Sequence, residues 1–207
     1  GICRSLGASI RRSGGLVRVH TERLTSAEVP PSLASRNRLS VLMLAPLLHR
    51  RGEAVIPRAG GDRIGARPVD FHLDAYRQMG AEVRVVDGVY LARADRLRAA
   101  HIRLPYPSVS ATENVLMAAA VARGTTLLEG AAVEPEVQDL ASFLNAMGAR
   151  IRRETERTFR IDGVERLGGA RHQVIPDRLV AASLGAAAVS SGGDVFVRRA
   201  RAADMSS

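Results

Sequence analysis

A pattern that recurs about every seventy residues constrains this chain more than any other feature of its sequence. The first signature is a helix that ends in Gly-Ala and leads into an alternating strand, and it occurs at residues 5–10, 78–83 and 146–151. The second signature is an apolar helix, a glycine and a short strand, and it occurs at residues 40–56, 113–128 and 181–197. Both signatures recur in the same order, which predicts three related units, each with two helices that alternate with strands.

The glycines and the hydrophobic pattern of these units predict how the elements pack. Gly7, Gly80 and Gly148 are placed as helix C-caps, where a left-handed backbone ends a helix at little cost. The helices are very apolar, with no charge over residues 115–121, so we expect them to be buried on most sides. The strands alternate polar with apolar residues, so we expect one face of each to meet water. Helices inside and sheets outside predict an inside-out α/β barrel, with the repeated units around a pseudo-threefold axis.

Length and composition bound the size of the fold. The chain has 207 residues, of which 46% are hydrophobic and 3% aromatic, enough for one domain or for one domain and part of another. The longest apolar run, near residues 39–48, is about half the length that spans a bilayer, so no membrane helix is expected. The chain starts without Met inside a predicted helix and ends shortly before a fourth copy of that helix is due, so we expect a fragment of a longer protein.

The cysteine and charge content narrow the function classes. Cys3 is the single cysteine, which gives neither a disulfide framework nor a metal cluster, and we expect a buried, inert thiol in a reducing, cytoplasmic setting. The net charge is +9, and every basic residue is Arg. That charge raises a nucleic-acid-binding module as a hypothesis. The arginines are spread along the chain without interleaved aromatic residues, however, which favours small anionic ligands that pair with the guanidinium fork.

The densest cluster of candidate site residues is the loop 58–72. Its three glycines let backbone N–H groups turn toward an anion, and Arg63 and Arg67 add positive charge. Asp62 could serve as a general acid if burial raised the pKa of its carboxyl group. The alternative is a solvated turn in which Asp62 and Arg67 form an ion pair. His72 is expected to pack rather than to bind a metal, and the other histidines lack ligand spacing, so no metal site is predicted.

Two further segments could do chemistry. Residues 105–114 lead into an apolar helix that Ser110 or Thr112 can cap. The free N–H groups at the start of that helix form a natural phosphate site, although a cap without a ligand explains the residues equally well. Paired carboxylates at Glu134 and Glu136 could do acid–base work, but acids beside a proline more often begin a helix, whose dipole they favour.

Together these segments resemble the UDP-N-acetylglucosamine enolpyruvyl transferases, the family also called UDP-N-acetylglucosamine 1-carboxyvinyltransferases. The strings Gly-Ala-Arg-Pro-Val-Asp and Gly-Val-Glu-Arg-Leu-Gly-Gly are the specific part of the match, and the resemblance covers nearly the whole chain. The sister enzyme that makes enolpyruvylshikimate phosphate shares the fold but not these strings. The matching segments are residues 60–70, 108–114, 124–126, 134–136, 163–169 and 176–178.

The resemblance implies a fold, an activity and partners. The family has two similar domains, each of three repeated units with helices packed inside, so residues 1–177 would be most of the first domain without its N-terminal strand, and residues 178–207 the start of the second. The family enzyme transfers an enolpyruvyl group from phosphoenolpyruvate to the 3-hydroxyl of UDP-N-acetylglucosamine, the first committed step of peptidoglycan synthesis. It needs no metal or organic cofactor, and the two substrates are the implied partners, with no nucleic acid and no membrane.

The resemblance also implies roles for single residues. Asp62 stands where the family usually has Cys on a mobile loop, so it would be the catalytic acid. The absence of the thiol that fosfomycin alkylates implies resistance to that drug. Arg67 matches the arginine that binds phosphoenolpyruvate. The residues implied to hold substrate are Arg38, Arg67, Pro68, Val69, Asp70, Phe71, Tyr106, Pro107, Ser108 and Val109.

Departures from the family pattern limit what the chain is expected to do alone. The family's Lys-Asn pair for phosphoenolpyruvate would lie before Gly1, and its second-domain Asp and a second phosphate-binding Arg would lie beyond Ser207. Val180 stands where an acidic residue is usual, and Ser110 replaces a usual Gly. We therefore expect weak binding of the UDP-sugar and little or no turnover. A catalytically dead paralogue that binds a sugar nucleotide or a protein partner is the alternative.

Overall fold

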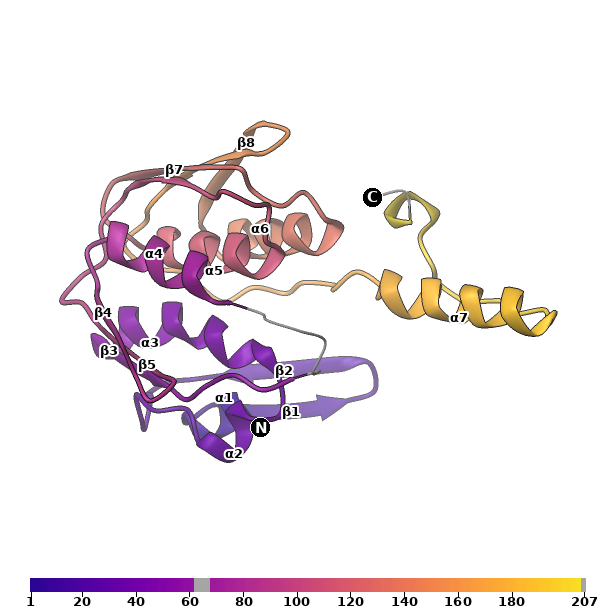
Figure 1. Ribbon diagram of the computed structural model, residues 1–207, viewed down its shortest axis with the longest axis horizontal. Helices are drawn as coiled ribbons and strands as arrows, with labels where there is room; N and C mark the ends of the chain where they lie inside the picture. The colour runs from indigo at the N-terminus through magenta and orange to yellow at the C-terminus, as the bar shows by residue number, and fades with distance from the viewer. Residues whose placement is uncertain (62–67, 206–207) are drawn as a thin grey trace.

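The computed structural model describes residues 1–61 and 68–205. The helices between residues 44 and 146 lie together in the middle of the body, and strands form its outer walls (Figure 1). The helices are α1 (Ile2–Ser5), α2 (Pro31–Ala34), η1 (Arg38–Met43), α3 (Leu44–Arg51), α4 (Asp70–Gln78), α5 (Val109–Ala119), α6 (Pro135–Ala146), α7 (Arg178–Ser191) and η2 (Ala202–Asp204). The strands are β1 (Ser9–Ser13), β2 (Leu16–His20), β3 (Glu53–Ile56), β4 (Glu82–Val86), β5 (Val89–Arg93), β6 (His101–Arg103), β7 (Thr125–Glu129), β8 (Arg150–Thr155) and β9 (Thr158–Asp162).

Two sheets of the body share one topology. One has the strand order β3-β5-β4 and the other β6-β7-β9-β8, with β6 parallel to β7 and the other neighbours antiparallel. In the first sheet, Glu28 forms a parallel bridge with Val55 of β3. This bridge has the place that β6 has beside β7 in the second sheet. Helices α3 and α5 precede β3 and β7, and helices α4 and α6 precede the hairpins β4–β5 and β8–β9. Two successive parts of the chain therefore fold in the same order.

Glycines just past the helices adopt the left-handed backbone that the sequence predicts. The φ angle is +104° at Gly7, +90° at Gly80 and +100° at Gly148, each one residue past the C-cap of α1, α4 or α6. Gly52 and Gly192 are the C-cap residues of α3 and α7, with φ angles of +72° and +65°. A side chain is strained at such angles, whereas glycine is not, so these five helices end beside the glycines that the sequence places there. The left-handed backbone predicted for Gly7, Gly80 and Gly148 is confirmed, although the C-cap itself is the residue before each of them.

The core consists of aliphatic and alanine side chains between the central helices and the inner faces of the sheets. Leu44 and Leu47 on α3 and Leu116 on α5 are fully buried. Tyr76 and Phe159 are among the largest fully buried side chains. Strands β3 and β7 alternate buried residues with less buried ones, so each turns one face toward the helices and the other outward. Burial of these apolar surfaces is the main force that holds the sheets on the helices.

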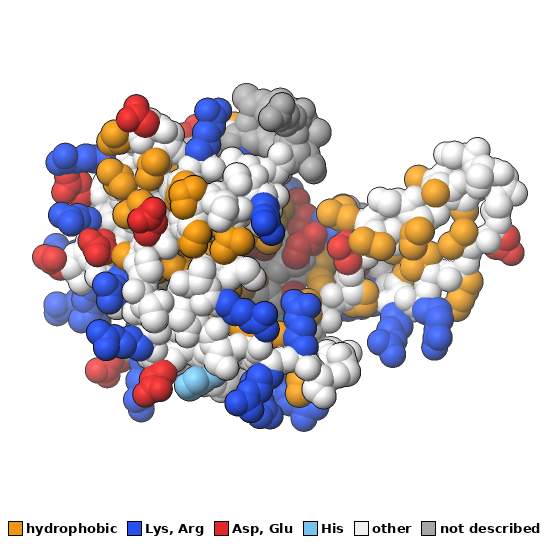
Figure 2. Space-filling view, turned by 90° about the horizontal axis from the view of Figure 1, so that it is seen from below, with side chains coloured by type: hydrophobic (Ala, Val, Ile, Leu, Met, Phe, Trp, Pro, Cys, Tyr) orange, Lys and Arg blue, Asp and Glu red, His pale blue; other side chains and the backbone are white. Residues whose placement is uncertain are grey.

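Helix α7 departs from the prediction that the helices are buried. It lies in an arm that leaves the body (Figure 1). Ala181 is buried, but Leu179, Leu184 and Val189 are exposed, and Figure 2 shows apolar side chains along the surface of this arm. The prediction is wrong for α7 because, among the described residues, no second layer of helices or strands covers it. No helix in the described part of the chain is long and apolar enough to cross a membrane.

Two smaller expectations are also wrong. Residues 195–197, predicted as a strand, are not in a sheet. The matching strands β3 and β7 obtain their hydrogen bonds from β5 and β9, and no strand of the described residues stands in that place beside 195–197. Cys3, predicted to be buried, is exposed, because α1 is a four-residue helix that buries none of its side chains among the residues described.

Gly163 provides a test of how tightly the backbone is packed. A Cβ atom at Gly163 would lie 1.7 Å from the Ala122 carbonyl oxygen, whereas one at Gly169 would meet no atom within 4 Å. The Gly163 N–H also donates to the Gly124 carbonyl oxygen at 2.9 Å, which opposes a shift of the backbone. We expect Gly163→Ala to lower the free energy of unfolding by about 3 kcal/mol and Gly169→Ala to change it by less than about 0.5 kcal/mol. Urea unfolding followed by circular dichroism measures both, and equal effects would contradict the packing argument.

Candidate functional site

Helices α4 and α5 lie side by side and run in the same direction. The Nε2 atom of His72 lies 3.2 Å from the Ser110 hydroxyl oxygen, and the Tyr76 hydroxyl donates to the side-chain oxygen of Asn114 at 2.9 Å. Both pairs join residues 38 positions apart, and the second pair lies one turn further along both helices. The two helices are therefore parallel, and their N-termini lie at the same end.

The first of these N-termini belongs to α4, which begins directly after Pro68 and Val69. The Val69 carbonyl oxygen accepts a hydrogen bond from the Leu73 N–H at 3.1 Å, which closes the first turn. The N–H groups of residues 70–72 belong to that turn and find no acceptor among the described residues. The Val69 side chain is buried and Phe71 packs against the core, so at Val69 the backbone is the part that can face a ligand.

The second N-terminus belongs to α5, which begins at Val109 after the N-cap Ser108. The Ser108 hydroxyl oxygen accepts from the Ala111 N–H at 3.4 Å. The prediction that Ser110 or Thr112 caps this helix is wrong. The helix begins at Val109, before the apolar run from which it was predicted. The Thr112 hydroxyl instead donates to the Ser108 carbonyl oxygen at 2.9 Å. The N–H groups of Val109 and Ser110 have no acceptor in the described part of the chain and are open to a ligand.

A cation reaches the same end of the molecule from η1. Arg38 is the first residue of η1, and its Nη2 group donates to the Pro68 carbonyl oxygen at 2.5 Å. Arg38 therefore lies close to the first turn of α4, and its positive charge helps to lower the pKa of His72. Tyr106, just before α5, has 66% of its surface exposed. The structure thus places Arg38 against the segment 68–71, and it places α4 against α5, which begins at the end of the segment 106–109. That these residues hold a substrate together stays a prediction.

A buried amide connects the three helices. The side-chain nitrogen of Asn114 donates to the Val41 carbonyl oxygen on η1 at 3.2 Å and lies 2.7 Å from Nδ1 of His72 on α4. The Asn114 side-chain oxygen accepts from the Tyr76 hydroxyl. Asn114 is fully buried and His72 is 1% exposed. Because a buried polar group that loses its partner is costly, this network favours one arrangement of η1, α4 and α5.

The arrangement suits an anion. The dipoles of two parallel helices point their positive ends toward the same place, and each helix offers free N–H groups there. The guanidinium group of Arg38 adds a full positive charge and a planar set of donors that matches phosphate. Within residues 1–61 and 68–205, no group of three or more His, Cys, Asp or Glu side chains is arranged to hold a metal ion. The described residues thus offer groups whose charge and geometry suit a phosphate group.

A second polar cluster lies at the start of α6. Glu134 is the N-cap residue and Pro135 the first residue of α6, so the interpretation of the Glu134–Glu136 pair as a helix start is confirmed. The Glu136 carboxylate forms an ion pair with Nε of Arg178, the first residue of α7, at 3.2 Å. Burial, reinforced by the Glu136 charge, raises the pKa of Glu113. This cluster joins α6 to α7 and does not contribute cationic groups to the anion site.

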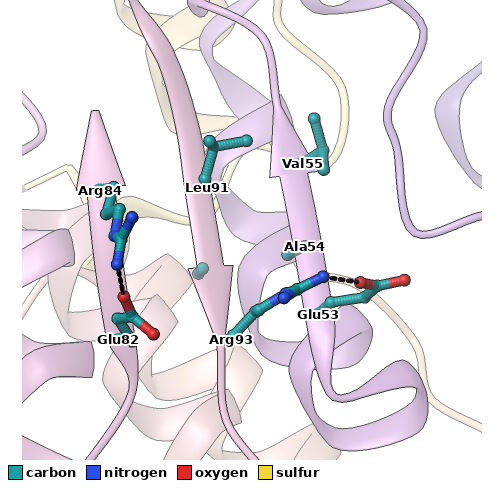
Figure 3. A pocket seen from close by; sticks show the side chains of 8 residues that line it. Glu53, Ala54, Val55, Glu82, Arg84, Leu91 and Arg93 are labelled. Atoms are coloured by element: carbon teal, nitrogen blue, oxygen red, sulfur yellow. Dashed lines mark hydrogen bonds and ion pairs between the residues drawn. The ribbon is translucent and has the colours of Figure 1, made fainter. Parts of the chain in front are cut away.

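A cavity on the outer face of the sheet β3-β5-β4 is a weaker candidate. Its volume is about 280 Å3, and it lies where β3 and β4 begin, after the C-terminal ends of α3 and α4 and so away from their N-termini (Figure 3). Its charged side chains pair with one another, Arg93 with Glu53 at 3.4 Å and Arg84 with Glu82. The pairing leaves few charged groups for a ligand. Its lining residues are Glu53, Ala54, Val55, Glu82, Arg84, Leu91, Ala92 and Arg93.

Known proteins identify the family of the chain. The family model described as EPSP synthase (3-phosphoshikimate 1-carboxyvinyltransferase) matches residues 1–206. UDP-N-acetylglucosamine 1-carboxyvinyltransferase 2 of Carboxydothermus hydrogenoformans is 45% identical over 196 residues, which cover 95% of this chain and 47% of that protein. The UDP-N-acetylglucosamine 1-carboxyvinyltransferase of Halorhodospira halophila is 48% identical over 182 residues, which cover 88% and 44%. This chain belongs to the enolpyruvyl transferase family.

The fold agrees with that membership. The enolpyruvyl transferase NikO from Streptomyces tendae superposes with a TM-score of 0.72 at 27% sequence identity, over 88% of this chain and 44% of that one. The expected α/β fold of the enolpyruvyl transferases is confirmed. The chain spans about half the length of the curated relatives it matches.

Most of the residues that the resemblance implies for the site lie in the described part of the structure. Arg38, Pro68 to Phe71 and Tyr106 to Val109 lie at one end of α4 and α5. Asp62 and Arg67, to which the resemblance gives the chemistry, lie outside the described residues, so their roles stay predictions. The sequence reasoning did not assign Asn114 or Tyr76 to the site. A signal for Asn114 was present, because an amide directly before the apolar run 115–121 needs a buried partner.

The buried imidazole predicts a pH-dependent stability. Burial, with a smaller contribution from the Arg38 charge, lowers the pKa of His72 from 6.5 to about 4, while the Asp70 carboxylate opposes the shift. Between these values the unfolded chain binds a proton that the folded chain does not, so stability falls as the pH drops from 6.5 to 4. We expect the stability difference between the unaltered chain and His72→Gln to shrink by about 3 kcal/mol between pH 7 and pH 4. If the free energies of unfolding of the two proteins changed in parallel with pH, His72 would not be the source of the pH dependence.

Proposed function

We propose that this chain carries the UDP-sugar side of an enzyme that transfers an enolpyruvyl group from phosphoenolpyruvate to the 3-hydroxyl of UDP-N-acetylglucosamine in peptidoglycan synthesis. The observation that carries the proposal is the convergence of Arg38 and the starts of α4 and α5, in segments that match the family's sugar-nucleotide site. The names of the curated relatives support the choice of substrate. The diphosphate of that substrate is an anion of the kind that helix N-termini and arginine bind.

In this proposal the diphosphate lies across the free N–H groups of residues 70–72 and 109–110. Arg38 pairs with a phosphate oxygen while it keeps its hydrogen bond to Pro68. The exposed ring of Tyr106 is available to contact the nucleoside or the sugar. The backbone supplies most of the donors, which fits the burial of the Val69 side chain. The substrate is thus oriented by groups that the fold already holds in place.

The phosphoenolpyruvate side of the site rests on the family pattern. In the proposal, Asp62 acts as the acid toward phosphoenolpyruvate, and Arg67 offsets the charge that develops on its phosphate group. Neither role requires a metal or an organic cofactor. A cytoplasmic location goes with this proposal, because the single cysteine fits a reducing setting.

We also propose the domain boundary after residue 177 and the pseudo-threefold arrangement of units within a domain. The side chain of Asp177 caps α7 by accepting from the N–H groups of Leu179 and Val180 at 2.9 and 3.1 Å, so a new helix starts at this point. The arm that carries α7 leaves the body here (Figure 1). In the proposal, the exposed apolar side chains of α7 belong to the core of the second domain.

Removal of Arg38 tests the proposed ligand site. We expect Arg38→Ala to weaken the binding of UDP-N-acetylglucosamine about tenfold, because a charge-assisted hydrogen bond to phosphate is lost. Arg77→Ala is the matched control, since Arg77 lies at the other end of α4 and pairs with Asp74 at 2.6 Å. Its binding should change less than about twofold. Isothermal titration calorimetry measures both, and equal losses would argue against a site at the helix starts.

The 207-residue chain can be tested for turnover as well as for binding. We expect weak binding of UDP-N-acetylglucosamine by calorimetry and no measurable phosphate release from phosphoenolpyruvate, because an electrostatic site that lacks several of its groups loses orders of magnitude in rate. A colorimetric phosphate assay with both substrates checks this expectation. Robust turnover would show that the chain holds a complete active site, and a failure to bind the UDP-sugar would contradict the proposed function.

A further inference from the structure

The hydrogen bonds around Asn114 determine where the His72 ring carries its proton. The Val41 carbonyl oxygen, 3.2 Å away, can only accept, so it must face the amide nitrogen of Asn114. That nitrogen is also the atom 2.7 Å from Nδ1 of His72, while the amide oxygen accepts from Tyr76. Both amide hydrogens are therefore used, and Nδ1 must be the acceptor of the second. The proton of the neutral ring consequently lies on Nε2.

The position of that proton determines the role of Ser110. Nε2 lies 3.2 Å from the Ser110 hydroxyl oxygen, so His72 donates and Ser110 accepts. The hydroxyl hydrogen of Ser110 must then point away from the ring. In α7, Ser183, Ser190 and Ser191 donate their hydroxyl hydrogens to carbonyl oxygens one turn back in the helix. The Ser110 hydroxyl hydrogen has no such acceptor in the described part of the chain, so a donor is left over at the start of α5.

We propose that Ser110 is a further ligand-binding residue, whose hydroxyl group donates to a phosphate oxygen of the UDP-sugar, and that His72 is a positioning residue that acts through Ser110. The inference rests on the proposed function. Ser110 is half-buried in the first turn of α5, beside the free N–H group of Val109 and its own. A phosphate oxygen bound by these N–H groups is thus within reach of the hydroxyl group in the same turn.

The surroundings of His72 keep this arrangement in place. The charged groups that face the ring are Arg38 from η1 and Asp70 from α4, and burial outweighs both in setting its pKa at about 4. The ring is therefore neutral near pH 7, and Nδ1 remains free to accept from Asn114. A protonated ring would present an N–H group to the amide hydrogens of Asn114, and the network would lose a hydrogen bond.

The ligand role is tested by calorimetry with UDP-N-acetylglucosamine on the whole chain. We expect Ser110→Ala to weaken binding about tenfold and Ser110→Thr, which keeps a hydroxyl group, to weaken it less than about threefold. Inorganic pyrophosphate as a second probe should respond to Ser110→Ala in the same direction, because the proposed partner is a phosphate oxygen. Unchanged binding of the UDP-sugar by Ser110→Ala would overturn the inference and leave the proposed function intact. Loss of binding by the unaltered chain would instead remove the proposed function and, with it, this role of Ser110.

The positioning role of His72 is tested by a double-mutant cycle. His72→Asn removes the donor to Ser110, whereas His72→Gln places an amide donor near the position of Nε2. We expect about tenfold weaker binding for His72→Asn, partial recovery for His72→Gln, and no further loss when His72→Asn is added to Ser110→Ala. Additive losses would show that His72 does not act through Ser110. Circular dichroism establishes that each variant is folded before it is titrated.

The tautomer can be observed without any ligand. In a 15N-labelled chain, long-range 1H–15N correlations of the His72 ring distinguish a proton on Nε2 from one on Nδ1. We expect the Nε2–H form at pH 7. The Nδ1–H form would overturn the proton arrangement on which the inference depends, whatever the binding data show.

Discussion

The side-chain amide of Asn114 holds the candidate site together. Asn114 is fully buried where α5 packs against η1 and α4. Its amide nitrogen and its amide oxygen both have hydrogen-bond partners on these two elements. A buried amide that loses one partner costs about 1–3 kcal/mol, so the three helices are strongly biased toward the single register in which all partners are met. The predicted substrate segments sit on the first turns of two of these helices, so their separation follows from that register.

The electrostatics of the site follow from the direction of the chain. Helix α4 runs away from the site, and the chain then passes through β4 and β5 before β6 returns it to the end where α5 begins. The two helices are therefore parallel, and their positive ends coincide. The backbone supplies this field whichever side chains are present. Arg38 reinforces it, and the hydroxyl group of Ser110 adds a donor whose direction depends on the buried histidine.

Much of the fold could be predicted because its cues are local. Gly7, Gly80 and Gly148 end helices because glycine tolerates a left-handed backbone, and the residues that follow the second and third form hairpin strands of the body. The start of α5 could not be placed as well, because Ser108 caps it before the hydrophobic pattern begins. The exposure of α7 and of Cys3 was missed because burial depends on what lies opposite a side chain, which a hydrophobic pattern does not report.

By itself, the sequence determined where several helices end and which strings match a family, since both depend on neighbouring residues along the chain. Through the resemblance to that family, it also predicted that Arg38 and the segments 68–71 and 106–109 share one site. The tertiary structure decided which side chains hold that site in shape. Asn114 meets its partners across 38, 42 and 73 positions of sequence. No local pattern encodes such distances, because they arise only when the helices and sheets pack around a common core.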